Sequence, residues 1–129
     1  MAAGMIAFGA MVSASAAGVG YVNSNALLQA HPKMQKAQLD MRAAAQKAEE
    51  TFRSRSAGKT DQEKQQIATE LQKEMDQKEK ATMDPIFSDV RKAIQQTRQE
   101  KGLDVILEAG AVLDGGVDVT SAAAQHLAK

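Results

Sequence analysis

The residues that could perform chemistry are two histidines and a group of carboxylates near the C-terminal end of the chain. The carboxylates are Asp104, Glu108, Asp114 and Asp118. Paired carboxylates can act as general acid and base or hold a cation, but no partner base or phosphate-binding loop accompanies these four. His31 and His126 lack a third donor at metal-ligand spacing, and the chain has no cysteine. The sequence therefore predicts no enzyme, no metal site and no cofactor.

The same residues have simpler structural interpretations. Asp118 and Thr120 are typical of the cap of a final helix that runs through Leu127 to Lys129. His31 is better read as a boundary residue than as a catalyst, because a residue before proline avoids the α region. Pro32 is then expected at the first position of the following helix.

Charge is balanced over the whole chain and unevenly distributed along it. The 129 residues carry 16 basic and 16 acidic side chains. Residues 1–32 have no charged side chain, residues 33–56 have six basic against three acidic, and residues 102–129 have one basic against four acidic. A neutral chain with few aromatic residues argues against nucleic acid as a partner.

The elements that must position these side chains begin with one long helical hairpin over residues 33–101, with arms at about 33–56 and 61–101. Both arms show apolar residues at helical steps of three and four. The first stripe is Met34, Ala37, Met41, Ala44, Ala48 and Phe52, and the second is Ile67, Leu71, Met75, Met83, Ile86 or Phe87, Val90 and Ile94. Gly58 can close the first arm, and Thr60 with Glu63 fits a capping box.

The seam of this hairpin is thin. Alanine and methionine stand where a stable coiled coil has leucine and isoleucine. We expect a hairpin that is flexible toward its tip. The proline of Asp84-Pro85 should kink the second arm.

The remaining residues predict a leader and a small body. Residues 1–17 read as an export signal, removed after Ala16 or Ala17. Residues 18–32 and 102–129 form a β-rich body with short strands at 19–23, 103–108 and 111–114. So small a body rarely folds alone, so we predict a homo-oligomer that shares a sheet or barrel. The expected interface residues are Val19, Tyr21, Val105, Ile106, Leu107 and Val112.

The order of these parts resembles the Skp/OmpH family of periplasmic chaperones. Three groups of residues carry the resemblance. The first is 19–24 with Leu27-Leu28 and 31–33, and the second is Pro85-Ile86 with 101–107. The third is the run Val112-Leu113-Asp114-Gly115-Gly116-Val117-Asp118-Val119-Thr120. It implies an α+β fold in which a β-barrel-type trimerisation body, built from short strands, carries long projecting α-helical hairpins.

The resemblance also implies a function. Family members hold unfolded outer-membrane proteins, without ATP, in a cavity between the hairpins. In this chain the candidate client-binding residues are Met34, Met41, Phe52, Met75, Lys33, Lys36, Arg42, Arg53 and Arg55. Mobile methionines and long charged side chains offer weak contacts that suit many clients. The simpler interpretation, which the sequence favours, is that the methionines and Phe52 form the hairpin seam and that the basic residues form a solvated face.

Two further expectations concern the partners of this chain. Known members are strongly basic, so the neutral charge of this chain argues against contact with a membrane or with lipopolysaccharide. The alternative function is a structural coiled-coil adaptor of the cell envelope with one specific partner. A pull-down that returns one stoichiometric partner would favour the adaptor, and many unfolded clients would favour the chaperone.

Overall fold

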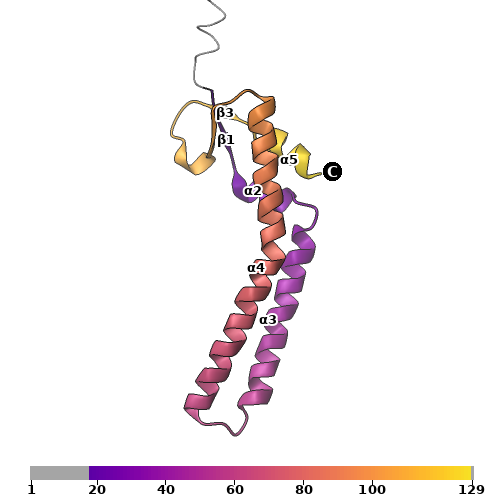
Figure 1. The fold of residues 1–129 in the computed structure, drawn as a ribbon, viewed down its shortest axis with the longest axis vertical. Coiled ribbons are helices and arrows are strands. Elements are labelled where there is room, and N and C mark those ends of the chain that lie inside the picture. Colours follow the sequence, from indigo (N-terminus) through magenta and orange to yellow (C-terminus); the bar gives the residue numbers. More distant parts are fainter. Residues whose placement is uncertain (1–17, 129) are drawn as a thin grey trace, which may run out of the picture.

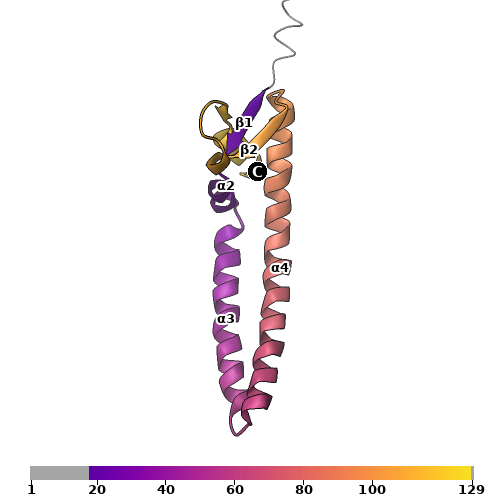
Figure 2. The same ribbon diagram turned by 90° about the vertical axis from the view of Figure 1, so that its left-hand side faces the viewer.

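The computed structural model describes residues 18–128 as a small body from which one long helical hairpin projects (Figures 1 and 2). The predicted leader, residues 1–17, and Lys129 lie outside the described residues. The fold is α+β and mostly helical. The elements in chain order are β1 (Val19–Val22), α2 (Ser24–Ala30), α3 (Met34–Ser56), α4 (Asp61–Glu100), β2 (Val105–Glu108), the 3-10 turn η1 (Ala109–Ala111), β3 (Val117–Asp118) and α5 (Thr120–Leu127).

The sheet has three parallel strands in the order β2-β1-β3. In the register, Val19 pairs with Val105 and Tyr21 with Leu107, while Gly20 pairs with Val117 on the other side of β1. One strand comes from the N-terminal side and two from the C-terminal side, as the sequence indicates. Within one chain this sheet is open at both edges.

The prediction of a strand at 111–114 is wrong. That segment follows a 3-10 turn, and the third strand lies later, at Val117–Asp118. Gly115 and Gly116 have φ values of 80° and 84°. Side chains are disfavoured in this left-handed region, so the two glycines turn the chain and deliver Val117, rather than Val112, to the edge of β1.

The core of the body lies between the sheet and three helices. Its buried residues come from β1, α2, α4 and the segment that leads into α5: Val22, Leu27, Val90, Ala93, Val119, Ala123 and Leu127. A second cluster at the root of the hairpin consists of Met34, Ala37 and Ile86, with Leu28 and Met83 packed against it. We call this second cluster the root cluster. The same helix, α4, contributes to both clusters.

The hairpin pairs α3 with the first part of α4, and the two helices lie side by side in both ribbon views (Figures 1 and 2). The helices run within one residue of the predicted arms. With 40 residues at about 1.5 Å each, α4 is about 60 Å long and extends well past the start of α3. It continues through Pro85, and Figure 1 shows a change of direction part-way along the helix rather than a break.

Local sequence signals set the helix ends. Asn23 caps α2 by accepting the N–H of Ala26. Thr60 caps α4 by accepting the N–H of Glu63, which confirms the predicted capping residue. Gly102, with φ of 64°, follows the last turn of α4, where its N–H and that of Leu103 donate to the carbonyls of Gln99 and Arg98. This is the pattern of a Schellman motif.

The proline at the start of the first arm lies elsewhere than predicted. Pro32 falls in the turn between α2 and α3, and α3 begins only at Met34 with Lys33 as its cap. The reason is His31: its ring accepts the N–H of Lys33, so residues 31–33 form a turn of their own before the helix starts. At the other end, α5 stops at Leu127.

Candidate functional site

The candidate client-binding residues fall into separate parts of the hairpin. Phe52 and Met75 lie opposite each other on α3 and α4, where both line a shallow groove with Ala48 and Leu71. Both side chains are partly exposed, whereas Leu71 beneath them is buried. The structure therefore brings these two residues together as the rim of an apolar groove on the arm.

The other two candidate methionines lie elsewhere. Met34 is buried in the root cluster and packs the hairpin onto the body. It is 18 residues before Phe52, about 27 Å along α3. Met41 is partly buried between these two positions. The four apolar candidates thus do not make one surface, and Met34 serves the seam.

The basic candidates are exposed and most are paired. Lys36 contacts Asp40 at 2.8 Å, Arg53 contacts Glu49 at 3.1 Å and Arg55 reaches Glu70 on α4 at 2.9 Å. The salt-bridge partners of Lys36 and Arg53 are one helical turn away on their own helix, a surface arrangement worth little stability. Between residues 18 and 128, Lys33 and Arg42 form no such ion pair.

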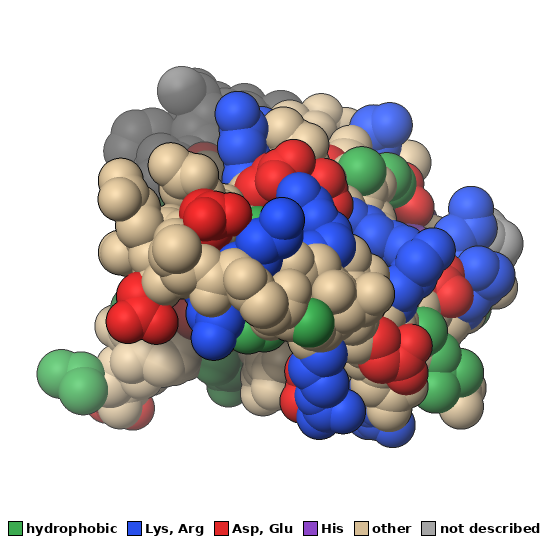
Figure 3. All heavy atoms as spheres, turned by 90° about the horizontal axis from the view of Figure 1, so that it is seen from below, with side chains coloured by type: hydrophobic (Ala, Val, Ile, Leu, Met, Phe, Trp, Pro, Cys, Tyr) green, Lys and Arg blue, Asp and Glu red, His purple; other side chains and the backbone are tan. Residues whose placement is uncertain are grey.

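Figure 3 views the molecule from below, onto the tip of the hairpin. Basic and acidic side chains are interspersed there, and hydrophobic side chains form small separate patches. On this face the surface is therefore a mosaic of opposite charges and small apolar patches, without a field of one sign.

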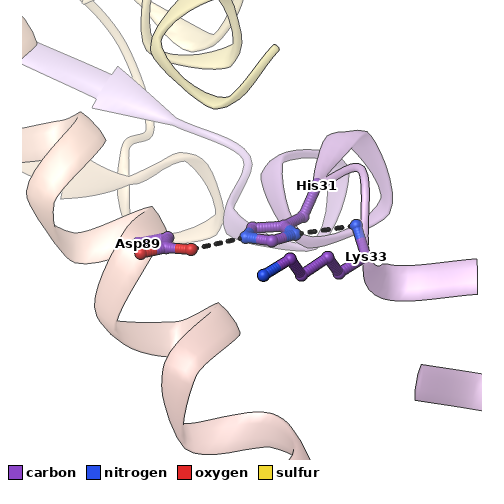
Figure 4. Close-up of polar contacts among 3 residues, drawn as sticks. All are labelled: His31, Lys33 and Asp89. Carbon is purple, nitrogen blue, oxygen red and sulfur yellow. Dashed lines mark hydrogen bonds and ion pairs between the residues drawn. The ribbon is translucent and has the colours of Figure 1, made fainter. Parts of the chain in front are cut away.

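His31 connects the body to both arms (Figure 4). Its side chain is buried, its Nδ1 accepts the N–H of Lys33 at 3.0 Å, and its Nε2 lies 2.8 Å from the carboxylate of Asp89 on α4. Because Nδ1 accepts, Nε2 carries the proton that is donated to Asp89. One ring thus joins the end of α2, the start of α3 and the middle of α4.

The electrostatics of this contact favour the ionised carboxylate. The hydrogen bond from His31 holds the pKa of the Asp89 carboxyl below its usual value, with Lys92 and Lys33 acting in the same direction and desolvation opposing them. Sequence analysis correctly placed His31 at a boundary but missed Asp89. The two residues are 58 positions apart, and no periodic pattern links them.

The outer face of the sheet is the second surface of interest. Val19, Tyr21, Val105 and Leu107 project on one side of β1 and β2, since they alternate with Gly20 and Ile106 in the register. Val105 and Leu107 are 38% and 40% exposed. Of the remaining predicted interface residues, Ile106 packs against the body core, and Val112 lies outside the strands.

Other exposed apolar residues were not singled out by the sequence. Leu113 is fully exposed in the loop before β3, Val117 is exposed on β3, and Leu39 is 55% exposed on α3. Leu39 stands off the apolar stripe of its helix, which is the one signal that could have identified it. For Leu113, only the loop geometry reveals the exposure.

Three of the four carboxylates near the C-terminal end have structural partners. Asp104 accepts the N–H of Gly18, Glu108 accepts the N–H of Ser24, and Asp118 accepts both the N–H and the hydroxyl of Thr120. The hydrogen bonds from Thr120 lower the pKa of Asp118. Within residues 18–128 no three His, Cys, Asp or Glu side chains gather as a metal site. Nor does any described helix combine the length and apolar character needed to cross a membrane.

Comparison with known families matches the part of the chain that contains most of the hairpin and the C-terminal side of the body. A family model described as "Outer membrane protein (OmpH-like)" covers residues 53–127, more than half of the chain. The chain belongs to the OmpH-like family. No individual curated protein matches it.

Membership in the OmpH-like family confirms the resemblance seen in the sequence. The match runs from the last turn of α3 through α4, the two C-terminal strands and α5. The OmpH-like family is one of periplasmic chaperones associated with outer-membrane proteins, not of enzymes. The N-cap of α5 is Val119, without a side-chain cap, and Asp104, Glu108 and Asp118 accept backbone N–H groups of the body.

Proposed function

We propose that this OmpH-like protein is an ATP-independent holdase chaperone of the periplasm that binds unfolded outer-membrane proteins in a cavity between the helical hairpins of its copies. The observation that carries the proposal is the surface of the hairpin. Shallow apolar grooves, such as the one rimmed by Phe52 and Met75, alternate with paired charges of both signs. Such a surface offers weak contacts to alternating apolar and polar side chains of an unfolded β-strand.

A single hairpin cannot enclose a client, so the proposal includes assembly. We place the contact between copies at the outer sheet face of Val19, Tyr21, Val105 and Leu107. The sheet is short, and its two edge strands leave backbone N–H and C=O groups without a strand partner. A barrel-type body shared by three chains would pair these edges and bury the outer sheet face. The three hairpins would then project together around one cavity.

The assembly is tested by measuring molar mass in solution. Leu107→Asp places a charge on the outer sheet face and should reduce the mass from that of a trimer to that of a monomer. Leu39→Asp is the matched control, because it adds the same charge at an exposed leucine on α3. A wild-type monomer at micromolar concentration, or trimers of the Leu107 variant, would contradict the proposed interface.

The holdase activity is tested by diluting an unfolded outer-membrane protein from urea, without ATP, and following light scattering. Suppression of scattering at stoichiometric concentration is expected. Equal light scattering with and without this protein would contradict the chaperone proposal. Recovery of one folded partner at fixed stoichiometry from the cell envelope, with no unfolded clients, would instead support the adaptor function.

The location of the client is tested by photo-crosslinking. A crosslinking amino acid at Gln72, which lines the Phe52–Met75 groove, should capture the unfolded client. The control position is Gln125, an exposed glutamine on α5 of the body. Equal capture at both positions would show that the hairpin groove is not the binding surface.

A further inference from the structure

Gly18 is the first residue of the described fold, and it already takes part in the sheet. Its N–H donates to the Oδ2 atom of Asp104 at 3.0 Å. Its carbonyl accepts the N–H groups of Asp104 at 2.9 Å and of Val105 at 3.3 Å. Three hydrogen bonds at one residue therefore fix the start of β1 against the start of β2, where Val19 pairs with Val105.

The residues immediately before Gly18 are small. They read Ala14-Ser15-Ala16-Ala17. Endopeptidases that remove export signals require small side chains at the first and third positions before the cut. A cut after Ala16 and a cut after Ala17 both satisfy this requirement, so the sequence alone leaves two alternatives.

We propose that the cut falls between Ala17 and Gly18, and that the new α-ammonium group of Gly18 forms an ion pair with Asp104. The proposal rests on the export proposed above. In the cleavage, the C–N bond of the peptide breaks and the hydroxyl of one water joins the Ala17 carbonyl carbon. The second proton of that water and the proton of the new acid both end on the Gly18 nitrogen, which leaves a carboxylate and an ammonium.

The cut converts one neutral donor into a charged group with three donors at the same atom. Hydrogen bonds between ionised partners are about twice as strong as neutral ones, although exposure of Asp104 to solvent reduces the gain. A cut after Ala16 would place the ammonium one residue, about 3.8 Å of chain, away from the Gly18 nitrogen. Only the cut at Gly18 puts the charge where Asp104 already accepts a hydrogen bond.

The consequence is that processing and folding are linked. The scissile bond adjoins a residue whose N–H and carbonyl are both engaged in the sheet. A glycine suits this crowded start, since an added Cβ would lie 3.1 Å from a methyl carbon of Leu103. The ion pair exists only in the processed chain, where it adds to the pairing of β1 with β2 that the hydrogen bonds of Gly18 already provide.

The cut is tested by the intact mass and N-terminal sequence of the protein recovered from the cell envelope. The proposal expects a chain that starts at Gly18. A chain that starts at Ala17, or one that keeps residues 1–17, overturns the assignment.

The ion pair is tested on purified chains of residues 18–129, which contain the whole described fold, and needs no export. The reaction rate of the N-terminal amine with an acylating reagent is measured against pH by mass spectrometry. The amine of an unstructured chain titrates near pH 8. In the wild-type chain its pKa should be higher than in Asp104→Asn, and equal values would refute the pair.

Thermal unfolding of the same two proteins provides a second readout. Because the pair raises the pKa of the amine in the folded state, its stabilisation is present below about pH 8 and is lost as the pH rises through the folded value. The midpoint of the wild type should exceed that of Asp104→Asn by roughly 1–5 °C at pH 6 and match it at pH 10. A constant difference would refute the pair. Holdase activity retained in both proteins would leave the proposed function standing in that case.

Discussion

Replacement of Ile86 by alanine tests how the hairpin is held to the body. Ile86 is 2% exposed and forms the root cluster with Met34 and Ala37. The change removes three carbons from a buried site, about 2.4 kcal/mol of transfer free energy at roughly 0.8 kcal/mol each. The residual cavity adds to this cost, and measured Ile→Ala changes in cores span about 2–5 kcal/mol. We expect a loss of about 3 kcal/mol.

Urea unfolding followed by circular dichroism measures this loss, and Leu39→Ala is the matched control. It also removes three carbons, from a side chain on α3 that is 55% exposed, so we expect a loss of about 1 kcal/mol or less. Hydrogen exchange should speed up in the first turns of α3 in the Ile86 variant alone. Equal losses in the two variants would show that the root cluster does not anchor the hairpin.

Three other substitutions have defined outcomes. The hydrogen bond from His31 lowers the pKa of Asp89 in the folded protein, so this contact stabilises the fold above about pH 3.8 and is lost as the pH falls through the folded pKa. In Asp89→Asn, the fall in melting temperature below about pH 3.8 should therefore be smaller than in wild type. Thr60→Ala removes the cap of α4 and should lower the free energy of unfolding by about 1 kcal/mol. Amide hydrogen exchange should become faster at the hairpin tip in this variant. Gly116→Ala should destabilise the protein by about 1 kcal/mol or more in chemical unfolding, because φ is 84° and the new Cβ would lie 3.2 Å from the Val19 carbonyl oxygen; an unchanged midpoint would contradict that geometry.

The hairpin could be predicted from the sequence because its signals are local and repeated. The apolar period extends over both arms, and Gly102 and Thr60 mark helix ends through contacts within a few residues. In the apolar stripe of the second arm, the periodic pattern allowed either Ile86 or Phe87 at one position. Packing against Met34 decides for Ile86, since the side chain of Phe87 is 42% exposed.

The body and the candidate site depended more on contacts between distant residues. Short stretches that contain valine occur at 111–114 and at 117–119 alike, and only the backbone of Gly115 and Gly116 determines which of them reaches β1. The contact between His31 and Asp89 spans 58 positions and leaves no pattern in the sequence. Such pairings follow from the assembled core, so local propensity cannot supply them.

The two arms differ in how they are joined to the body, and this sets how they can separate. α4 is one uninterrupted helix that contributes Val90 and Ala93 to the body core and Ile67 to the arm. Its direction relative to the body is therefore fixed by the core. α3 is attached through the short turn at residues 31–33 and the root cluster. A load on the hairpin should therefore displace α3 about that turn while α4 keeps its direction, so the root of the hairpin decides how firmly the two helices stay aligned.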